Sequence, residues 1–357
     1  MQELKIIKRD VLKEKPQDES KLGFGQHFTD YMFVMRYDKD KGWHTPTIEP
    51  YAPIALDPAC MTLHYGQAIF EGMKAYVGAN GRIRMFRPEE NMRRLNVSAR
   101  RMSIPEVDEA FLLDSIKKLV LMESDWIPKS PGTSLYVRPF IFATEANVGV
   151  RASYSYLLMV ILSPVGAYYA SGLAPVKIYV EDQFVRAVRG GTGFTKAAAN
   201  YAMSLFAGEE AKAQGYSQVL WLDGVERRYV EEVGAMNIFF RFNDELVTPS
   251  LEGGSILSGI TRKSVIELAR HMGVTVNERR LSIDEVHERH QKGELLEVFG
   301  SGTAAVISPV GELKKGEHVM VINDGKIGEL SQKLYDTLTG IQLGSVEDPF
   351  GWGVDLD

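Results

Sequence analysis

The sequence predicts a mixed α/β protein of two domains, and three observations support this. A chain of 357 residues is longer than one hydrophobic core usually serves. Short runs of β-branched and aromatic residues alternate along it with segments of helical periodicity. Turn-forming residues cluster between Ser163 and Pro175. We therefore expect a smaller N-terminal α/β domain at residues 1–163, an interdomain connection at 164–175 and a larger C-terminal domain at 176–357.

Turn and capping residues mark the elements of the first domain. Asn80-Gly81 is a strong hairpin signal, Pro88 suits the first turn of a helix, and Asp108 can cap another. We expect strands at 31–37, 76–77, 83–85, 134–143 and 155–162, and helices from Pro88 and from about Asp108.

Strands and helices continue to alternate in the second domain. The expected strands are 176–180, 218–222, 237–242 and 295–299, and the expected helices are 201–214, 260–272, 283–291 and one that begins near Gly328.

Composition excludes several classes of function. The net charge of -6 argues against a nucleic-acid partner, which needs a basic surface. Met1–Ser20 has no apolar stretch of the kind a secretory signal carries, and Leu157–Leu162, the longest apolar run, is too short to span a membrane. Cys60 is the only cysteine, which fits a reducing compartment, and we expect a cytoplasmic protein. No group of residues has the spacing of a metal site.

One glycine-rich segment, Gly190–Tyr201, stands out for chemistry. It contains Gly190-Gly191-Thr192-Gly193, then Lys196 and three alanines. A plain strand-to-helix connection with a surface lysine is one interpretation. A P-loop fits poorly, because Phe194 and Thr195 separate the glycine from the lysine and no Ser or Thr follows. The third interpretation is a lysine that forms a Schiff base with pyridoxal phosphate, for which the alanines leave a flat slot.

Further segments, in the same order, match one known family. They are Leu63–Gly66, Phe70–Gly72, Phe86–Pro88, Thr133–Pro139, Glu231–Asn237, Ser258–Arg262 and Phe299–Ala304. Together with Gly190–Tyr201 they resemble the branched-chain amino-acid aminotransferases, which are fold-type-IV enzymes. The similarity spans roughly Phe24 to Pro309. It implies a two-domain architecture with pyridoxal 5'-phosphate bound between the domains.

The resemblance also implies roles for individual residues. Lys196 would be the catalytic lysine that holds the cofactor, and Glu232 would face the pyridine nitrogen, whose protonated form a carboxylate favours. Tyr201 would donate to the phenolic oxygen, and Leu257 would pack on the ring. The phosphate would be bound by Arg87 and Arg186 and by two loops that contain Ile260, Thr261 and Thr303.

The implied substrate pocket is lined mainly by aromatic residues. Its expected members are Phe24, Tyr65, Phe70, Tyr136, Arg138, Tyr168 and Ala304. Arg138 lies two residues after Tyr136 and therefore on the same face of a strand. A substrate carboxylate could be its partner, and an internal ion pair is the alternative.

The expected reaction moves the amino group of leucine, isoleucine or valine to 2-oxoglutarate, so the partners are small amino acids and 2-oxo acids. The resemblance also implies a homodimer. Two alternatives stay open: another fold-type-IV enzyme (a D-amino-acid transaminase or an aminodeoxychorismate lyase), and a non-catalytic module that binds a nucleotide phosphate.

The sequence departs from the family pattern at a few positions. Ala235 replaces a threonine of some relatives. Ala305 and Ser308 stand where mammalian relatives have a Cys-x-x-Cys pair, so thiol regulation of that type is not expected.

Overall fold

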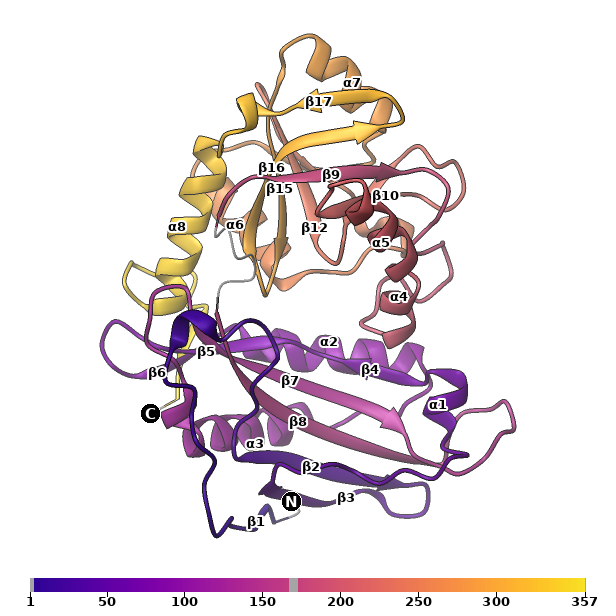
Figure 1. The fold of residues 1–357 in the computed structure, drawn as a ribbon, viewed down its shortest axis with the longest axis vertical. Coiled ribbons are helices and arrows are strands. Elements are labelled where there is room, and N and C mark those ends of the chain that lie inside the picture. Colours follow the sequence, from indigo (N-terminus) through magenta and orange to yellow (C-terminus); the bar gives the residue numbers. More distant parts are fainter. Residues whose placement is uncertain (1–2, 167–172, 357) are drawn as a thin grey trace. The chain divides into compact units, whose positions relative to one another are not determined.

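The computed structural model of the chain describes residues 3–166 and 173–356, and Figure 1 shows its elements. The chain divides into two compact units. Unit 1 comprises Met1–Tyr168, Thr195–Ala198 and Gly340–Asp357, and unit 2 comprises Tyr169–Phe194 and Ala199–Thr339. Among the helices of the described residues, none has the length and apolar character needed to cross a membrane.

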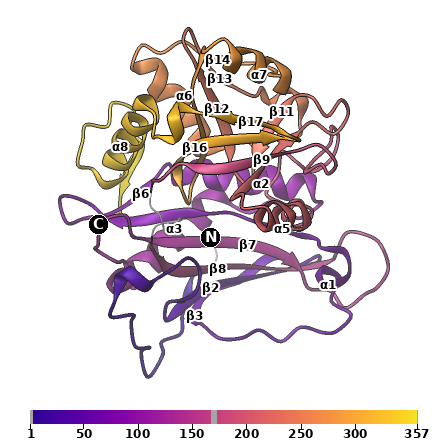
Figure 2. The same cartoon turned by 45° about the horizontal axis from the view of Figure 1, so that its top comes forward.

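Unit 1 is built on a nine-stranded sheet with the order β1-β3-β2-β8-β7-β5-β6-β18, and β4 pairs separately with β7. The long strands β7 and β8 run antiparallel at its centre in both views (Figures 1 and 2). The strands are β1 (Lys5–Ile6), β2 (Tyr31–Asp38), β3 (Gly42–Pro50), β4 (Ala68–Phe70), β5 (Met73–Val77), β6 (Ile83–Phe86), β7 (Ser134–Ala143), β8 (Ser155–Val165) and β18 (Gly353–Asp355).

The α-helices of unit 1 pack on one face of this sheet. They are α1 (Met61–Tyr65), α2 (Pro88–Arg101) and α3 (Glu109–Met122). Asp108 caps α3 as predicted, since its side chain accepts the backbone N–H of Phe111. Leucines of α2 and α3 form one hydrophobic core with residues from a single face of the sheet.

The register of β5 and β7 decides which residues point away from this core. Met73 pairs with Val137, and Lys74 pairs with Tyr136. Side chains alternate between the faces of a strand, and directly opposite residues share a face. Met73 and Val137 belong to the core with the helices. Lys74, Tyr136 and Arg138 therefore lie on the opposite face of the sheet.

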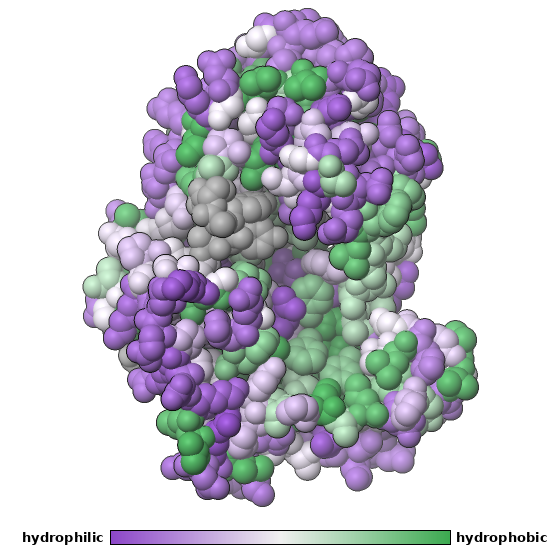
Figure 3. Space-filling model, viewed as in Figure 1, coloured by the Kyte–Doolittle hydropathy of each residue, from purple (hydrophilic) through white to green (hydrophobic). Residues whose placement is uncertain are grey.

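That opposite face carries apolar side chains as well. Met32, Val34, Phe142, Leu157 and Met159 form a second cluster there. Figure 3 shows hydrophobic side chains gathered over the region of β7 and β8. Polar and apolar side chains thus meet on the face of the sheet in unit 1 that lies opposite the helices, and most of them are buried.

Unit 2 has a second nine-stranded sheet, with the order β11-β10-β9-β16-β15-β12-β13-β14 and with β17 beside β16. Parallel pairs (β9 with β10 and with β16) occur next to antiparallel ones, so the α/β class is mixed as predicted. The strands are β9 (Val176–Glu181), β10 (Gln218–Leu222), β11 (Val230–Val233), β12 (Asn237–Phe242), β13 (Leu246–Thr248), β14 (Val276–Glu278), β15 (Leu295–Gly302), β16 (Val306–Lys315) and β17 (His318–Val321).

Helices pack on both faces of this sheet. Val219 and Trp221 of β10 lie in a cluster with α5, whereas Leu220 and Leu222 join the cluster that includes Ile283 of α7. The helices of unit 2 are α5 (Leu205–Ala213), α6 (Ile260–His271) and α7 (Ile283–Gln291), together with most of α4 (Ala198–Ala202) and of α8 (Glu329–Leu343).

Several strands of the structure, among them β3 and β16, were not predicted, and two further differences concern segments that the sequence prediction did assign. The helix predicted at 201–214 is two helices, because the Ser204 hydroxyl bonds the carbonyl oxygen of Tyr201 at 2.7 Å and the chain turns there. The sequence also placed residues 340–357 with the second half, whereas they belong to unit 1, where β18 pairs with β6. Both differences involve contacts that the hydrophobic periodicity of the sequence cannot predict.

Candidate active site

In unit 1, the backbone around Lys196 is fixed from both sides. Its N–H donates to Oγ of the fully buried Ser98 at 3.0 Å, and its carbonyl oxygen accepts the N–H of Phe70 at 3.0 Å. The next residue, Ala197, is buried and forms a bridge with Ile69 of β4. The segment Thr195–Ala198 is therefore laid against the strand that carries Phe70. This arrangement holds the lysine by its backbone.

The side chain of Lys196 meets the predicted substrate residues. Its Nζ lies 4.8 Å from the centre of the Phe70 ring, and the guanidinium carbon of Arg138 lies 4.6 Å from the same centre. Arg138 donates to Oη of Tyr136 at 3.1 Å, while its buried Nε has no hydrogen-bond partner. Phe24 packs edge-on against Tyr136, with ring centres 5.0 Å apart. The structure thus brings together Lys196 and four of the predicted substrate residues.

A glycine and a buried ion pair support this cluster. A Cβ on Gly72 would lie 2.1 Å from the Tyr136 hydroxyl, so only glycine leaves that hydroxyl in place. The neighbouring Glu71 is fully buried and is paired with Arg94 at 2.8 Å. Burial alone would raise the pKa of Glu71. The Arg94 guanidinium and, to a smaller extent, the charge of Lys196 lower it, and the pKa of Glu71 lies below its ordinary value. Glu71 thus remains anionic beneath the cluster.

Other predicted residues lie elsewhere or cannot be placed. Tyr65 ends α1, is 40% exposed and donates from its hydroxyl to the carbonyl oxygen of Val148. Tyr168 falls outside the described residues. Arg87 is buried in the left-handed N-cap position of α2, where it pairs with Glu90 at 3.1 Å and lies over the ring of Trp352.

In unit 2, Glu232 of β11 is the centre of a buried network. Its Oε1 accepts the backbone N–H of Leu257 at 2.8 Å, and its Oε2 lies 3.4 Å from Nε of Arg186. Both charged side chains are almost fully buried. Arg186 also donates to the carbonyl oxygen of Ser255. Two predicted cofactor residues, Arg186 and Leu257, therefore hold a third, Glu232, in one orientation.

The neighbouring Glu231 is in a different environment. Its Oε1 accepts the hydroxyl of Ser255. Burial raises the pKa of Glu231 above its ordinary value, and the charge of Glu232 adds to this, although a hydrogen bond from Ser255 and the charge of Arg186 oppose it. Of the two glutamates, Glu232 is the one that has an arginine in contact with its carboxylate.

Two loops that were predicted to bind phosphate lie next to each other in unit 2. Helix α6 begins at Ile260, its N-cap is Gly259, and no side chain caps it, so its first amides are left for an anion. Asn237 donates to the carbonyl oxygen of Leu257 at 2.9 Å and pairs with Ser301 across β12 and β15. Asn237 therefore joins the start of α6 to the turn that contains Thr303 and Ala304. Thr261 is buried in the first turn of the helix.

Tyr201 lies in α4, directly after the lysine segment. The turn before it is braced by Asn200, which accepts from the Thr192 hydroxyl at 2.6 Å and donates to the Thr192 carbonyl oxygen at 2.9 Å. Gly193 packs where a Cβ would lie 2.2 Å from the carbonyl oxygen of Ser255, so this position requires glycine. The glycine-rich segment is thus a tightly packed turn in this structure.

The residues described above are of the kinds that bind pyridoxal phosphate. The described residues offer a backbone-anchored lysine, a buried carboxylate held by Arg186, a helix start with amides that no side chain caps, and a buried arginine at the start of α2. Among the described residues, no group of His, Cys, Asp and Glu side chains could hold a metal ion.

Several supporting residues were not identified from the sequence. Ser98 and Arg94 act through packing partners that are distant in the chain, and neither belongs to a matching segment. Asn237 ends the matching segment Glu231–Asn237, but no role was assigned to it. Glu71 and Gly72 were part of a matching segment, but only the structure shows what each contacts.

Comparison with known proteins identifies the family of the chain. Residues 68–313 match the family model of amino-transferase class IV. Branched-chain-amino-acid transaminase 1 of Bacillus subtilis is 58% identical over 356 residues, which is 99% of both chains. A probable branched-chain-amino-acid aminotransferase of Staphylococcus aureus is 59% identical over 354 residues, or 99% of this chain and 98% of the relative.

Solved structures show the same fold. The branched-chain amino acid aminotransferase of Escherichia coli has a TM-score of 0.77 at 28% identity, with 92% of this chain and 99% of that chain covered. The branched-chain aminotransferase of Thermoproteus uzoniensis, solved with norvaline, has a TM-score of 0.75 at 25% identity, with 92% and 100% covered. The chain belongs to the class IV aminotransferases and, among them, to the branched-chain amino-acid aminotransferases.

Proposed function

We propose that the protein transfers the amino group of L-leucine, L-isoleucine or L-valine to 2-oxoglutarate with the help of pyridoxal 5'-phosphate. The observation that carries this proposal is the approach of Lys196 and Arg138 to the same Phe70 ring. An amine that can react with a cofactor aldehyde thus lies near a guanidinium that can bind a carboxylate. When bound, the cofactor supplies an electron sink for the carbanion that arises at the substrate α-carbon.

Lys196 has two tasks in this proposal. Its Nζ holds the cofactor in the resting enzyme, and it moves a proton to and from the substrate during the transfer. The bonds from Ser98 and Phe70 fix its backbone, so only the side chain has to move. The ion pair with Arg94 keeps the Glu71 carboxylate ionised next to the cluster.

Glu232 keeps the ring nitrogen of the cofactor protonated. Arg186 and the N–H of Leu257 orient its carboxylate and favour its ionised form. In the structure Arg186 contacts this carboxylate, so we assign it the task of holding Glu232, in addition to the phosphate role expected from the sequence.

Phosphate recognition would come from amides and one arginine. The first turn of α6 offers the N–H groups of Ile260 and Thr261, and the turn after β15 offers Thr303. Arg87 would add a charge-assisted bond. Tyr201 would donate its hydroxyl to the phenolic oxygen.

The substrate side chain needs two kinds of surroundings. Phe24, Phe70 and Tyr136 provide apolar surface for leucine, isoleucine and valine. Arg138, with its buried Nε lacking a hydrogen-bond partner, provides the charge that the second carboxylate of 2-oxoglutarate requires. Tyr65, Tyr168 and Ala304 remain proposed members of the pocket.

We also propose a homodimer in the cytoplasm. A cytoplasmic location is consistent with the single cysteine, Cys60, which is buried and reduced.

A visible spectrum tests the proposed function directly. The purified protein should be yellow, and L-leucine should bleach the band while 2-oxoglutarate restores it. D-Alanine should leave the band unchanged. A colourless protein that binds no pyridoxal phosphate, or one that responds to D-alanine instead, would contradict the proposal.

A further inference from the structure

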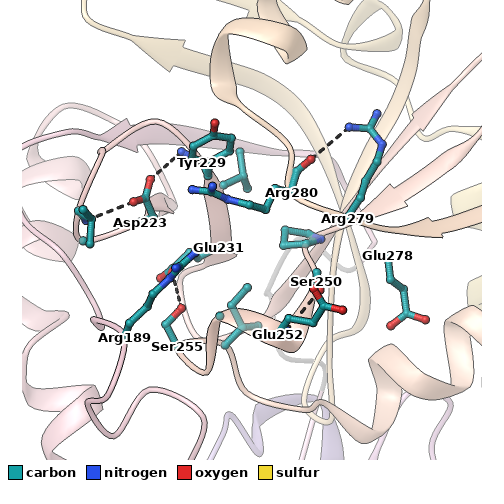
Figure 4. Close-up of a pocket in the computed structure, with 16 residues that line it drawn as sticks. Arg189, Asp223, Tyr229, Glu231, Ser250, Glu252, Ser255, Glu278, Arg279 and Arg280 are labelled. Atoms are coloured by element: carbon teal, nitrogen blue, oxygen red, sulfur yellow. Dashed lines mark hydrogen bonds between the residues drawn. The ribbon is translucent and has the colours of Figure 1, made fainter.

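Unit 2 contains a pocket whose lining does not include Glu232. It has a volume of about 510 Å³, within the range of small-molecule sites. Its walls come from the turn before β11, the segment between β13 and α6, the end of β14 and the segment that precedes Lys196 (Figure 4). All of these segments belong to unit 2.

The floor of this pocket is Glu231. The residue is 7% exposed, its Oε1 accepts the hydroxyl of Ser255, and its buried Oε2 has no hydrogen-bond partner. A buried carboxylate oxygen without a donor costs free energy. A ligand that brings an N–H group to Oε2 would remove that cost.

Most other charges around the pocket are already neutralised within the protein. The Asp223 carboxylate accepts backbone N–H groups of its own turn, including those of Glu226 and Tyr229 at 2.8 Å. The remaining ion pairs are Glu278 with Arg262 and Arg270, Arg279 with Glu245 and Glu285, and Arg280 with Glu226.

Arg189 is the exception among the cations of the pocket. It is exposed and forms no ion pair or hydrogen bond with any described residue. Figure 4 shows its side chain directed toward Glu231 and Ser255. Glu252, also exposed, adds a carboxylate at the rim. The pocket therefore offers one buried anion at its floor and one unengaged cation above it.

Part of the pocket lining is apolar. Val230 and Ile256 are buried and line the pocket, and Pro249 lies beside them. The ring of Tyr229 is covered by the Arg280 guanidinium at 3.4 Å, which rigidifies that side. A small hydrocarbon side chain fits such a wall.

We propose that this pocket is a second, non-catalytic binding site for an α-amino acid with an apolar side chain. The ammonium group donates to Oε2 of Glu231, the carboxylate binds Arg189, and the side chain packs on Val230 and Ile256. A zwitterion satisfies both unengaged charges at once, whereas a simple anion leaves Glu231 without a donor and a simple amine leaves Arg189 without a partner.

Hydrogen–deuterium exchange on the cofactor-bound enzyme tests this site, because it reports on the pocket without depending on turnover. L-Leucine, 3-methylbutylamine (no carboxylate) and 4-methylpentanoate (no ammonium) are titrated, and protection is followed at residues 223–231 and 278–280. We expect L-leucine to protect these segments at concentrations about 10- to 100-fold lower than either truncated probe, as expected for one lost charge-assisted contact.

Two variants separate the contacts. Arg189→Ala should lower the apparent affinity of the pocket for L-leucine to its affinity for 3-methylbutylamine. The affinity for 3-methylbutylamine should not change. Glu231→Gln should weaken the binding of L-leucine and of 3-methylbutylamine to the same extent. Arg36→Ala, which removes an exposed arginine of β2 in unit 1, serves as the control and should change nothing.

Three outcomes would overturn the proposal. One is an absence of protection by L-leucine at these segments in the wild-type enzyme. Another is equal protection by L-leucine and one of the truncated probes, which would indicate a plain amine or anion site. The third is unchanged L-leucine protection in Arg189→Ala. If Glu231→Gln fails to fold, Arg189→Ala still tests the proposal, because this substitution alters only an exposed side chain.

Discussion

The guanidinium of Arg186 lies 3.4 Å from the carboxylate of Glu232, and both side chains are buried. A buried ion pair with a further bond from the Leu257 N–H keeps the carboxylate ionised and fixed. This relationship explains why one of two adjacent glutamates is suited to face a protonated ring nitrogen. It also leads to the first prediction.

Glu232→Gln should still bind pyridoxal phosphate but should slow the L-leucine half-reaction by roughly two orders of magnitude or more, because the charge that we propose supports the protonated ring is lost. Single-turnover absorbance kinetics would measure this. Glu231→Gln, the matched neighbour, should retain far more activity. If Glu231→Gln were the slow variant, the assignment of the pair would be reversed.

Arg138→Met should impair glutamate and 2-oxoglutarate much more than leucine. The substitution keeps length and apolar character and removes the charge that we propose faces the second carboxylate. The expected difference between the two half-reactions is about 2–5 kcal/mol, the range for removing one partner of a buried charge pair. Equal losses with both substrates would show that Arg138 serves the shared α-carboxylate or a structural contact.

Gly72→Ala should raise KM for 2-oxoglutarate, because the added Cβ must displace the Tyr136 hydroxyl that Arg138 contacts. Overpacking of this kind costs about 1–3 kcal/mol. Gly208→Ala in α5, where an added Cβ meets nothing, is the control and should keep its activity. A Gly72→Ala enzyme with native KM values would mean that the position of Tyr136 is unimportant for the substrate.

Glu123→Gln should raise the stability of the protein relative to wild type more at high pH than at low pH. Burial raises the pKa of Glu123 from its ordinary value of 4.5 to about 7, with the nearby Asp30 adding to it and Lys13 opposing it. A raised pKa in the folded state contributes stability below the unfolded pKa, and that contribution is lost as pH rises through the folded pKa. The wild-type protein therefore loses stability at this group between about pH 4.5 and 7.

Thermal unfolding at pH 5.5 and pH 8 checks this prediction. The difference in Tm between Glu123→Gln and wild type should be more positive at pH 8. Glu14→Gln, at an exposed position, should show no such change with pH. A difference in Tm that is the same at both pH values would indicate that Glu123 does not titrate in this window.

The sequence predicted much of the fold because local signals were strong. The strands at 134–143, 218–222 and 237–242 and the helix at 283–291 have the predicted bounds. The short strand β18 was not foreseen, because its stability comes from pairing with β6, which lies far away in the sequence. The break between α4 and α5 lies at Ser204, whose hydroxyl and backbone N–H both donate to the carbonyl oxygen of Tyr201.

The candidate site could be predicted only as a set of residues. Family motifs identified Lys196, Glu232 and Arg138, but not what holds them. Ser98 and Arg94 lie in α2 and reach the lysine segment and Glu71 through tertiary packing, for which a linear sequence has no signal. The contact of Arg186 with Glu232 likewise required the structure.

The most direct measurement of the central claim is the visible absorbance of Lys196→Ala during addition of L-leucine, beside wild type. Wild type should show the band of protein-bound cofactor, lose it with L-leucine and regain it with 2-oxoglutarate. Lys196→Ala should lack the lysine-bound band and should have almost no turnover. Near-native turnover in Lys196→Ala would contradict the account, because another group would then have to hold the cofactor and move the proton.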